Sequence, residues 1–180
     1  MKRLVVLGSG TAGTMVVNKL RPRLDRAEWS ITVVDQDDQH VYQPGLLFVP
    51  FGLTHPEDIV RSRKRQLHTG IDYHQSAIDH VELAADTVHL TDGTVLAYDV
   101  LVVATGATLV PEETEGLFPW APNVHTFYTV DGAARLEAAL AEFTGGRVVI
   151  NVVDLPIKCP VAPLEFAFLA DWYFTERGIR

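Results

Sequence analysis

The sequence is short of cysteine, of long apolar runs and of positive charge, and each shortage argues against a class of protein. A single cysteine among 180 residues excludes an internal disulfide and is unlike an extracellular disulfide scaffold. No apolar run approaches the roughly 18 residues that a membrane-spanning helix needs. Lysine and arginine number 15 against 23 acidic residues, and the net charge of −8 argues against non-specific nucleic-acid binding.

Histidine and the few basic residues give no further site. The seven histidines have no metal-ligand spacing, so we expect no metal. The one basic run, Arg61 to Arg65, is interpreted as a solvated helix face, with a phosphate or anionic-lipid contact as the alternative. Because the chain enters a strand directly after its first residues, we expect no signal peptide and synthesis in the cytoplasm.

What is present is the material of an ordinary globular protein. Hydrophobic residues make up 47% of the chain and charged residues 21%, which is enough to build a core. The length suits one domain, or one domain and part of a second.

A glycine motif near the start organises the chain. Leu4 to Leu7 form a continuous apolar run that predicts a buried parallel strand. Gly8 then allows a tight bend, Gly10 lets a pyrophosphate approach the backbone, and Gly13 permits close packing of helix against strand. The helix predicted to follow carries apolar residues at Met15, Val16, Leu20 and Leu24.

The context of this motif predicts dinucleotide binding. A second strand is predicted over 29–35, and it ends in Asp35 about 20 residues after the last glycine. A carboxylate at that position can accept hydrogen bonds from ribose hydroxyls. The helix start adds free N–H groups and a partial positive charge for the pyrophosphate.

The middle of the chain predicts a loop, a helix and an antiparallel excursion. Residues 40–52 hold two prolines and two glycines, so we expect a loop or broken helix that packs on an apolar surface. Pro56 starts a helix expected to run to about Leu67. Short strands are predicted over 69–73, 77–83, 86–90 and 94–98, with a hairpin turn at Asp92-Gly93.

A fully buried strand is predicted from Val100, ending in the small-residue turn Ala104-Thr105-Gly106. Residues 109–124 contain three prolines and predict a linker. A helix over 131–143 and a buried strand over 147–153 follow.

The turn after this last strand holds prolines in place of a second glycine set. A stiff loop over 154–163 has few free N–H groups and is a poor phosphate cradle. A helix over 164–175 follows, with a buried stripe expected at Phe166, Phe168, Leu169 and Trp172. Because a lone strand and helix cannot bury both faces, we interpret the chain as an N-terminal portion of a longer protein.

The proline loop, the front glycine motif and Ala104-Thr105-Gly106 together resemble the sulfide:quinone oxidoreductases. These enzymes are relatives of flavocytochrome c sulfide dehydrogenase among the flavoproteins with two dinucleotide-binding domains. The segment Cys159 to Glu165 is the specific part of the resemblance, because the glycine motifs occur throughout the superfamily. The loop 40–46 is also similar to the one that borders the flavin ring in this group.

The resemblance implies an α/β fold: a doubly wound, Rossmann-like FAD-binding domain with an antiparallel excursion, plus the start of a second dinucleotide-binding-like domain. The implied boundaries are 1–110 for the first domain, with the excursion at about 71–98, then 111–125 for a linker and 126–180 for the second domain. The residues implied to bind FAD are Gly8, Gly10 and Gly13 at the pyrophosphate, Asp35 at the ribose, Ala77 at the adenine, Thr105 and Gly106 along the cofactor, and Gln43 and Pro44 near its ring.

Cys159 matches a redox cysteine beside the flavin, and Glu165 matches a carboxylate proposed to transfer protons. A neighbouring Lys158 favours the thiolate if the side chains are close. Other readings stay open: a lone cysteine is usually a small buried hydrophobe, and Glu165 suits the first turn of a helix for its charge alone. Family members often carry another cysteine where this chain has Tyr128, so a partner for Cys159 would lie outside these residues.

The resemblance implies an oxidoreductase that passes electrons from sulfide through FAD to quinone and produces sulfane sulfur or polysulfide. It further implies attachment to a membrane surface through a C-terminal half and leaves a homo-oligomer open. This portion alone is expected to be inactive. A type II NADH:quinone oxidoreductase is the first alternative, although it predicts a glycine turn after Val153 that is missing. A non-catalytic flavin-binding module is the second.

Overall fold

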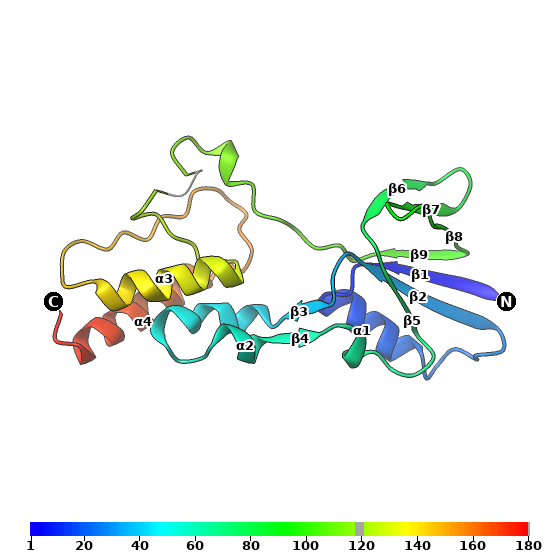
Figure 1. Cartoon of the computed structure of the whole chain (residues 1–180), viewed down its shortest axis with the longest axis horizontal. Helices are drawn as coiled ribbons and strands as arrows, with labels where there is room; N and C mark the ends of the chain where they lie inside the picture. Colours follow the sequence, from blue (N-terminus) through cyan, green and yellow to red (C-terminus); the bar gives the residue numbers. More distant parts are fainter. Residues whose placement is uncertain (118–120, 180) are drawn as a thin grey trace. The chain divides into compact units, whose positions relative to one another are not determined.

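The computed structural model describes residues 1–117 and 121–179. They divide into two compact units (Figure 1). Unit 1 comprises Met1–Val41 and Val60–Thr108, and unit 2 comprises Tyr42–Ile59 and Leu109–Arg180. The insertion 42–59 therefore groups with the C-terminal part of the chain, although it falls within the range expected for the first domain.

Unit 1 is built on a parallel sheet of four strands in the order β5-β2-β1-β9. The strands are β1 (Lys2–Leu7), β2 (Trp29–Asp35), β5 (Asp72–Gln75) and β9 (Val100–Val103). β1 is buried along Leu4 to Leu7, as its unbroken apolar run predicts. β9 is an edge strand, so the prediction that it is fully buried is wrong at Val100 and Val103, which are exposed.

The two faces of this sheet are covered differently. Helix α1 (Thr11–Leu20) packs on one face, where Val17 joins a core cluster with Leu4, Val6, Ile31 and Val33. The helix is shorter than its apolar pattern suggests: Met15 is half exposed and Leu24 lies beyond its end.

The other face carries the predicted antiparallel excursion, formed by β6 (Ile78–Glu82), β7 (Thr87–Leu90) and β8 (Val95–Ala97). Side chains of this layer, among them Val88 and Leu90, share a cluster with Val5 and Val34 of the sheet. The hairpin turn is confirmed, because the backbone N–H of Thr94 donates to Asp92 Oδ1 at 2.9 Å. A parallel sheet with a helix on one face and an antiparallel layer on the other confirms the α/β class.

The helix predicted over 56–67 is wrong. The chain forms one turn, α2 (Pro56–Ile59), then β4 (Val60–Ser62), which pairs antiparallel with β3 (Gln39–Val41), and then the 3₁₀ turn η3 (Lys64–Gln66). Backbone pairing with β3 and an ion pair made by Arg63 outweigh the local helix signal. The strand predicted over 69–73 starts later, at Asp72.

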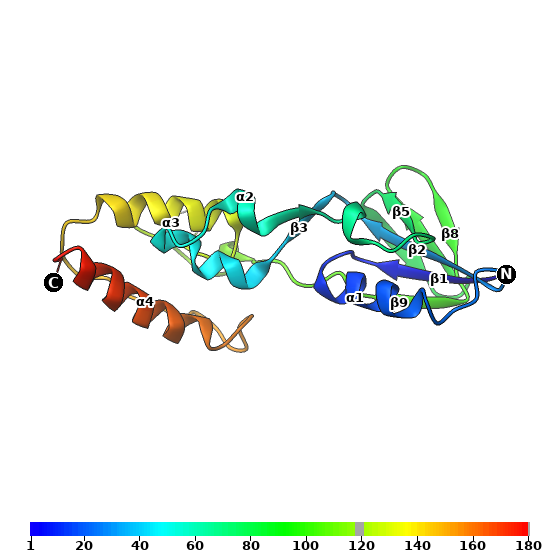
Figure 2. The same cartoon turned by 90° about the horizontal axis from the view of Figure 1, so that it is seen from below.

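Unit 2 is helical where it is regular. It contains η1 (Gln43–Leu47), η2 (Val49–Phe51), η4 (Pro111–Glu113), α3 (Val130–Glu142) and α4 (Ala162–Glu176) (Figure 2). The broken helix predicted over 40–52 is confirmed by η1 and η2, whose Leu47 and Phe51 pack with Leu136 of α3 and Phe166 of α4. Thr129 caps α3 through its hydroxyl, which accepts from the N–H of Gly132 at 3.0 Å.

Two further predictions in unit 2 are wrong. The buried stripe of α4 includes Phe166, which is 5% exposed, but Phe168 is 69% exposed and Trp172 is 44% exposed. The strand over 147–153 does not form, and Val149 is 72% exposed. A strand needs a neighbour for its backbone hydrogen bonds, and the described residues of unit 2 supply none.

Candidate dinucleotide-binding site

The glycine turn between β1 and α1 has the geometry that the motif predicts. Gly8 has a left-handed φ of 93°, and a Cβ added there would collide with the backbone of Ala104. A Cβ on Gly13 would collide with the carbonyl oxygen of Gly8. Gly10 has nothing within 4 Å of an added Cβ. The first and third glycines therefore allow close packing, while the middle one leaves open space against its backbone.

The start of α1 faces this open space. No side chain caps the helix at Gly10, and its first turn carries no acidic residue. Unpaired N–H groups and the positive end of the helix dipole suit an anion such as a phosphate. Thr14 fixes the turn, because its hydroxyl donates to the carbonyl of the fully buried Ser9 at 3.0 Å.

Asp35 at the end of β2 is bound to this turn. Its Oδ2 accepts from the N–H of Ser9 at 2.6 Å, and its Oδ1 accepts from the N–H of Gln36 at 2.8 Å. Arg63 adds an ion pair to the same Oδ2 at 2.8 Å. The side chains of Asp35 and Arg63 are only 12% and 15% exposed, so this ion pair is largely withdrawn from water.

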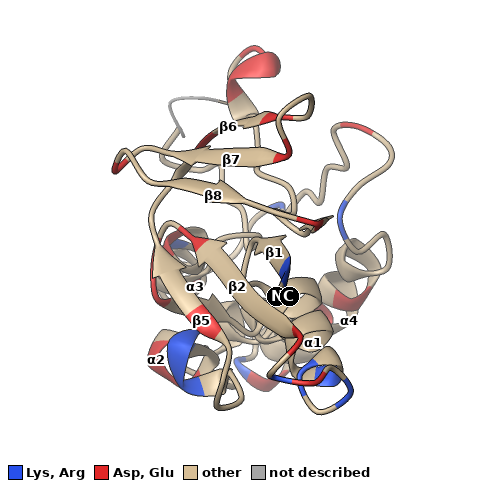
Figure 3. Cartoon of the chain, turned by 90° about the vertical axis from the view of Figure 1, so that its right-hand side faces the viewer, with Lys and Arg blue, Asp and Glu red and all other residues tan. Residues whose placement is uncertain are grey.

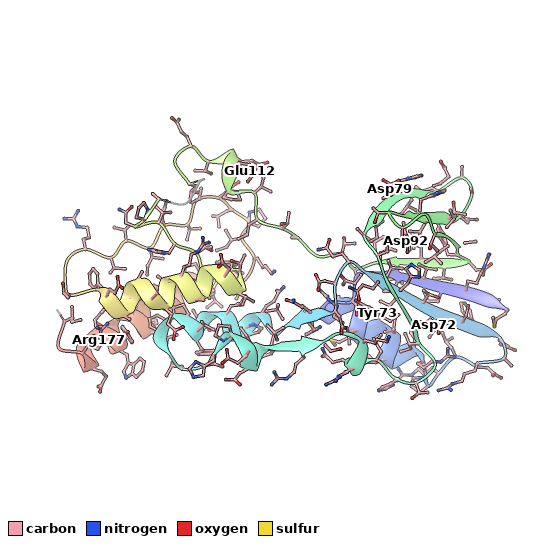
Figure 4. The ribbon with its side chains drawn as sticks, in the orientation of Figure 1. Asp72, Tyr73, Asp79, Asp92, Glu112 and Arg177 are labelled. Atoms are coloured by element: carbon pink, nitrogen blue, oxygen red, sulfur yellow. The ribbon has the colours of Figure 1, made fainter. Side chains whose placement is uncertain are left out.

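A second acid completes the network. Arg63 Nε lies 3.3 Å from Asp37 Oδ1, and the Tyr73 hydroxyl donates to the carbonyl of Asp37. Burial, and then the negative charge of Asp35, raise the pKa of Tyr73 to about 12. Tyr73, whose side chain is labelled in Figure 4, therefore keeps its proton at neutral pH and remains a donor.

Arg63 is the residue that sequence reasoning missed. The basic run was interpreted as solvated, and Arg61, Lys64 and Arg65 are indeed less buried than Arg63. The available signal was the acidic run from Asp35 to Asp38, which is complementary in charge to residues 61–65.

The other predicted contacts of unit 1 have these positions. Thr105 and Gly106 follow β9 and are exposed, and the backbone of Ala104 and Thr105 lies against Gly8. Gly106 has a left-handed φ of 76° and open space around an added Cβ. Ala77, between β5 and β6, is half-buried, and its carbonyl accepts from the N–H of Thr91 at 3.0 Å.

The remaining predicted site residues lie in unit 2. Gln43 and Pro44 are exposed on η1. Cys159 is an exposed free cysteine, and Glu165 is exposed in the first turn of α4. The structure thus brings the glycines, Asp35 and Thr105 together in unit 1 and places the redox candidates in unit 2.

Cys159 has an unusual backbone. Its φ of 57° is left-handed, which a residue with a side chain adopts at a cost of about 1–2 kcal/mol. The cysteine carbonyl accepts from the N–H of Ala162 at 3.1 Å and makes a longer contact of 3.5 Å with the Tyr128 hydroxyl. Burial, followed by the nearby thiol of Cys159, raises the pKa of Tyr128. Strained backbone at an exposed thiol is typical of functional loops.

The part of the chain that the structure describes contains neither a membrane-spanning helix nor a metal-binding cluster. Within residues 1–117 and 121–179, no helix is long and apolar enough to cross a bilayer. In the same residues no three histidine, cysteine or acidic side chains are grouped to hold a metal ion.

Comparison with known proteins defines the class. The family model described as pyridine nucleotide-disulphide oxidoreductase matches residues 2–152. The chain belongs to this family.

Particular relatives match over nearly the whole chain. The mitochondrial sulfide:quinone oxidoreductase of Mus musculus is 26% identical in an alignment that covers 98% of this chain and 39% of that protein. The enzyme of the same name from Dictyostelium discoideum is 26% identical over 99% of this chain and 40% of its own length. The resemblance drawn from the sequence is therefore confirmed, and the chain spans about two fifths of these relatives.

A solved structure shares the fold. The sulfide:quinone oxidoreductase from Aquifex aeolicus superposes with a TM-score of 0.80 at 23% identity, and the match covers 99% of this chain and 41% of that one. At this identity the likeness concerns the fold alone.

Proposed function

We propose that this chain is the FAD-binding part of a sulfide:quinone oxidoreductase, in which sulfide is oxidised to sulfane sulfur or polysulfide and the electrons pass to quinone. The observation that carries the proposal is Cys159, which is exposed and has a left-handed backbone conformation in a proline-rich loop. An enzyme with two nucleotide sites would need a second glycine turn at this place in the sequence. Membership of the oxidoreductase family and the two relatives of that name support it.

The residues of unit 1 fit FAD. The space beside Gly10 and the uncapped start of α1 suit a pyrophosphate, because backbone N–H groups can donate to it without a side chain intervening. Asp35 Oδ1 accepts from only one N–H among the described residues, which leaves it an acceptor site for a ribose hydroxyl. Ala77, Thr105 and Gly106 would contact the same cofactor. When bound, FAD supplies a two-electron acceptor.

The residues of unit 2 would act on the substrate. In this proposal Cys159 would carry the sulfane sulfur: its thiolate and hydrosulfide would form an S–S bond with loss of one proton and of two electrons that pass to bound FAD. The exposure of Cys159 gives sulfide access to it. Glu165 would hold or release the proton at its carboxylate, which is exposed to solvent. Gln43 and Pro44 would border the flavin ring, as in the family that the loop resembles.

The wider assignments are part of the same proposal. Residues 1–110 would form the FAD-binding domain, 111–125 a linker and 126–180 the beginning of the second domain. Sulfide and quinone would be the substrates, and the complete enzyme would attach to a membrane surface and could form a homo-oligomer. This portion alone would not turn over.

An anaerobic spectrum of the longest natural form tests the proposal. We expect sulfide to bleach the flavin bands, quinone to restore them, and Cys159→Ser to abolish the bleaching while leaving FAD bound. Tyr128→Phe serves as the control, because it lies beside the cysteine without supplying sulfur chemistry. Bleaching by NADH alone would instead indicate a type II NADH:quinone oxidoreductase. Flavin reduction by sulfide that is unchanged in Cys159→Ser would contradict the role of the cysteine.

A further inference from the structure

A cavity lined by basic side chains lies in unit 1 beyond the C-terminal end of α1. It has a volume of about 370 Å³ and is lined by Arg21, Pro22, Leu24, Arg26, His68 and Thr69. The glycine turn precedes the same helix, whose ten residues extend about 15 Å. The cavity therefore lies near the edge of the sheet where β2 and β5 begin, away from the proposed FAD site.

Arg21 is a buried cation without an anion. Its side chain belongs to a residue that is 4% exposed, and its guanidinium donates to three carbonyls, those of Leu24 at 2.6 Å, Gly70 at 3.2 Å and Trp29 at 3.3 Å. Its Nε has no partner and is closed to water. Carbonyl acceptors satisfy N–H groups, but they do not neutralise the charge, and a buried charge is costly without a counter-charge.

A second guanidinium converges on the same turn. Arg26 donates to the carbonyl of Thr69 at 2.5 Å, while Arg21 donates to the next carbonyl, that of Gly70. The Arg26 guanidinium also packs against Gly70, where an added Cβ would lie 2.8 Å from its Cζ. Two like charges held on adjacent peptide units repel each other.

Neither arginine forms an ion pair with a carboxylate in the described residues. Across residues 1–117 and 121–179, neither Arg21 nor Arg26 has an acidic oxygen within ion-pair distance. The cavity lining adds His68 and the hydroxyl of Thr69, and it contains no acidic side chain. Acidic as well as basic residues lie on the segment after α1 (Figure 3), but no acidic residue lines the cavity.

We propose that this cavity binds a phosphate group, held directly by Arg26, His68 and Thr69 and electrostatically by Arg21. The two guanidinium groups match the charge of a phosphate dianion, and the donors of Arg26, His68 and Thr69 match its acceptor oxygens. The volume admits a phosphate with part of the molecule that carries it. The same chemistry fits free phosphate and the headgroup of an anionic lipid.

Titration of the full chain with inorganic phosphate, at constant ionic strength set by chloride, tests the site. We expect saturable binding by calorimetry and a loss of roughly tenfold or more in affinity for Arg26→Gln, because a hydrogen bond to a charged group is removed. His68→Gln should weaken binding in the same direction. Arg23→Gln is the matched control: Arg23 is exposed on the same segment, bonds the carbonyl of Lys19 at 2.8 Å and does not line the cavity.

Vesicles separate the two sources of the phosphate group. Sedimentation with phosphatidylcholine vesicles that depends on added phosphatidic acid, and that Arg26→Gln abolishes, would assign the site to a lipid headgroup. Phosphate binding without vesicle binding would assign it to a free phosphate compound. Absence of both, or equal effects of Arg26→Gln and Arg23→Gln, would overturn the proposal. Because all variants keep the glycine turn, this outcome is independent of FAD binding.

Discussion

Removing Arg63 should destabilise unit 1 through Asp35. The two side chains are 12% and 15% exposed and their charged atoms are 2.8 Å apart. Breaking a fully buried pair costs about 3–5 kcal/mol, whereas an exposed pair contributes about 0.2–1 kcal/mol. Asp35 keeps the N–H groups of Ser9 and Gln36 as donors, so part of the loss is compensated. We therefore expect Arg63→Met to lower the free energy of unfolding by about 2 kcal/mol.

Urea unfolding followed by circular dichroism measures this change. Arg65→Met is the control, because Arg65 is exposed in the same basic run and should cost less than about 0.5 kcal/mol. A double-mutant cycle with Asp35→Asn should give a coupling energy of about 1–2 kcal/mol, since the residues are in direct contact. Equal losses for Arg63→Met and Arg65→Met, or a coupling energy near zero, would refute the reasoning.

Three further predictions follow from the core, the glycine turn and the acidic network. Gly13→Ala should destabilise the chain by about 1–3 kcal/mol in chemical unfolding, because its Cβ would collide with the backbone at Gly8; an unchanged midpoint would contradict this. Phe166→Ala should lower the free energy of unfolding by about 3 kcal/mol, since Phe166 is 5% exposed. Phe168→Ala should lower it by less than about 0.5 kcal/mol, because Phe168 is 69% exposed. Similar losses for the two variants would contradict the assigned buried face of α4. Because the pKa of Tyr73 is raised in the folded chain, its contribution to stability is present below pH 10 and is lost as the pH rises toward 12. Tyr73→Phe should therefore flatten the decline of the unfolding midpoint in this range. Midpoint profiles that run parallel in the variant and the parent chain would argue against it.

The parts of the fold that sequence predicts are those fixed by local pattern. Leu4 to Leu7 of β1 form a continuous apolar run because a central parallel strand is buried on both sides, and β2 is buried at Ile31, Val33 and Val34. The edge strand β9 carries the same kind of run but has a neighbour on one side alone, so residue type does not report its exposure. The segment 147–153 has the residue types of a strand but has no neighbouring strand among the described residues. Whether such a neighbour is present depends on the rest of the fold and not on the sequence of the segment.

In the candidate site, too, some features could be predicted from the sequence and others depend on tertiary contacts. The glycine turn could be read from the sequence because the motif has a fixed spacing, in which Gly8 and Gly13 allow close packing and Gly10 leaves space beside the backbone. The contact between Arg63 and Asp35 could not, since it depends on β4 pairing with β3 and on the failure of the predicted helix. Phe168 shows a similar limit: α4 is apolar around much of its surface, so periodicity alone does not choose the buried face.

The most direct test of the central claim is a titration of the flavin-free chain with FAD, followed by quenching of flavin fluorescence. We expect saturable binding of one FAD and at least about a tenfold loss of affinity in Gly10→Ala, because the added methyl occupies the space next to the backbone donors without disturbing the packing of the turn. Unfolding of Gly10→Ala should match that of the parent chain to within about 0.5 kcal/mol, which separates a binding defect from a folding defect. Absence of FAD binding in the parent chain, or equal affinity in Gly10→Ala, would contradict the dinucleotide site.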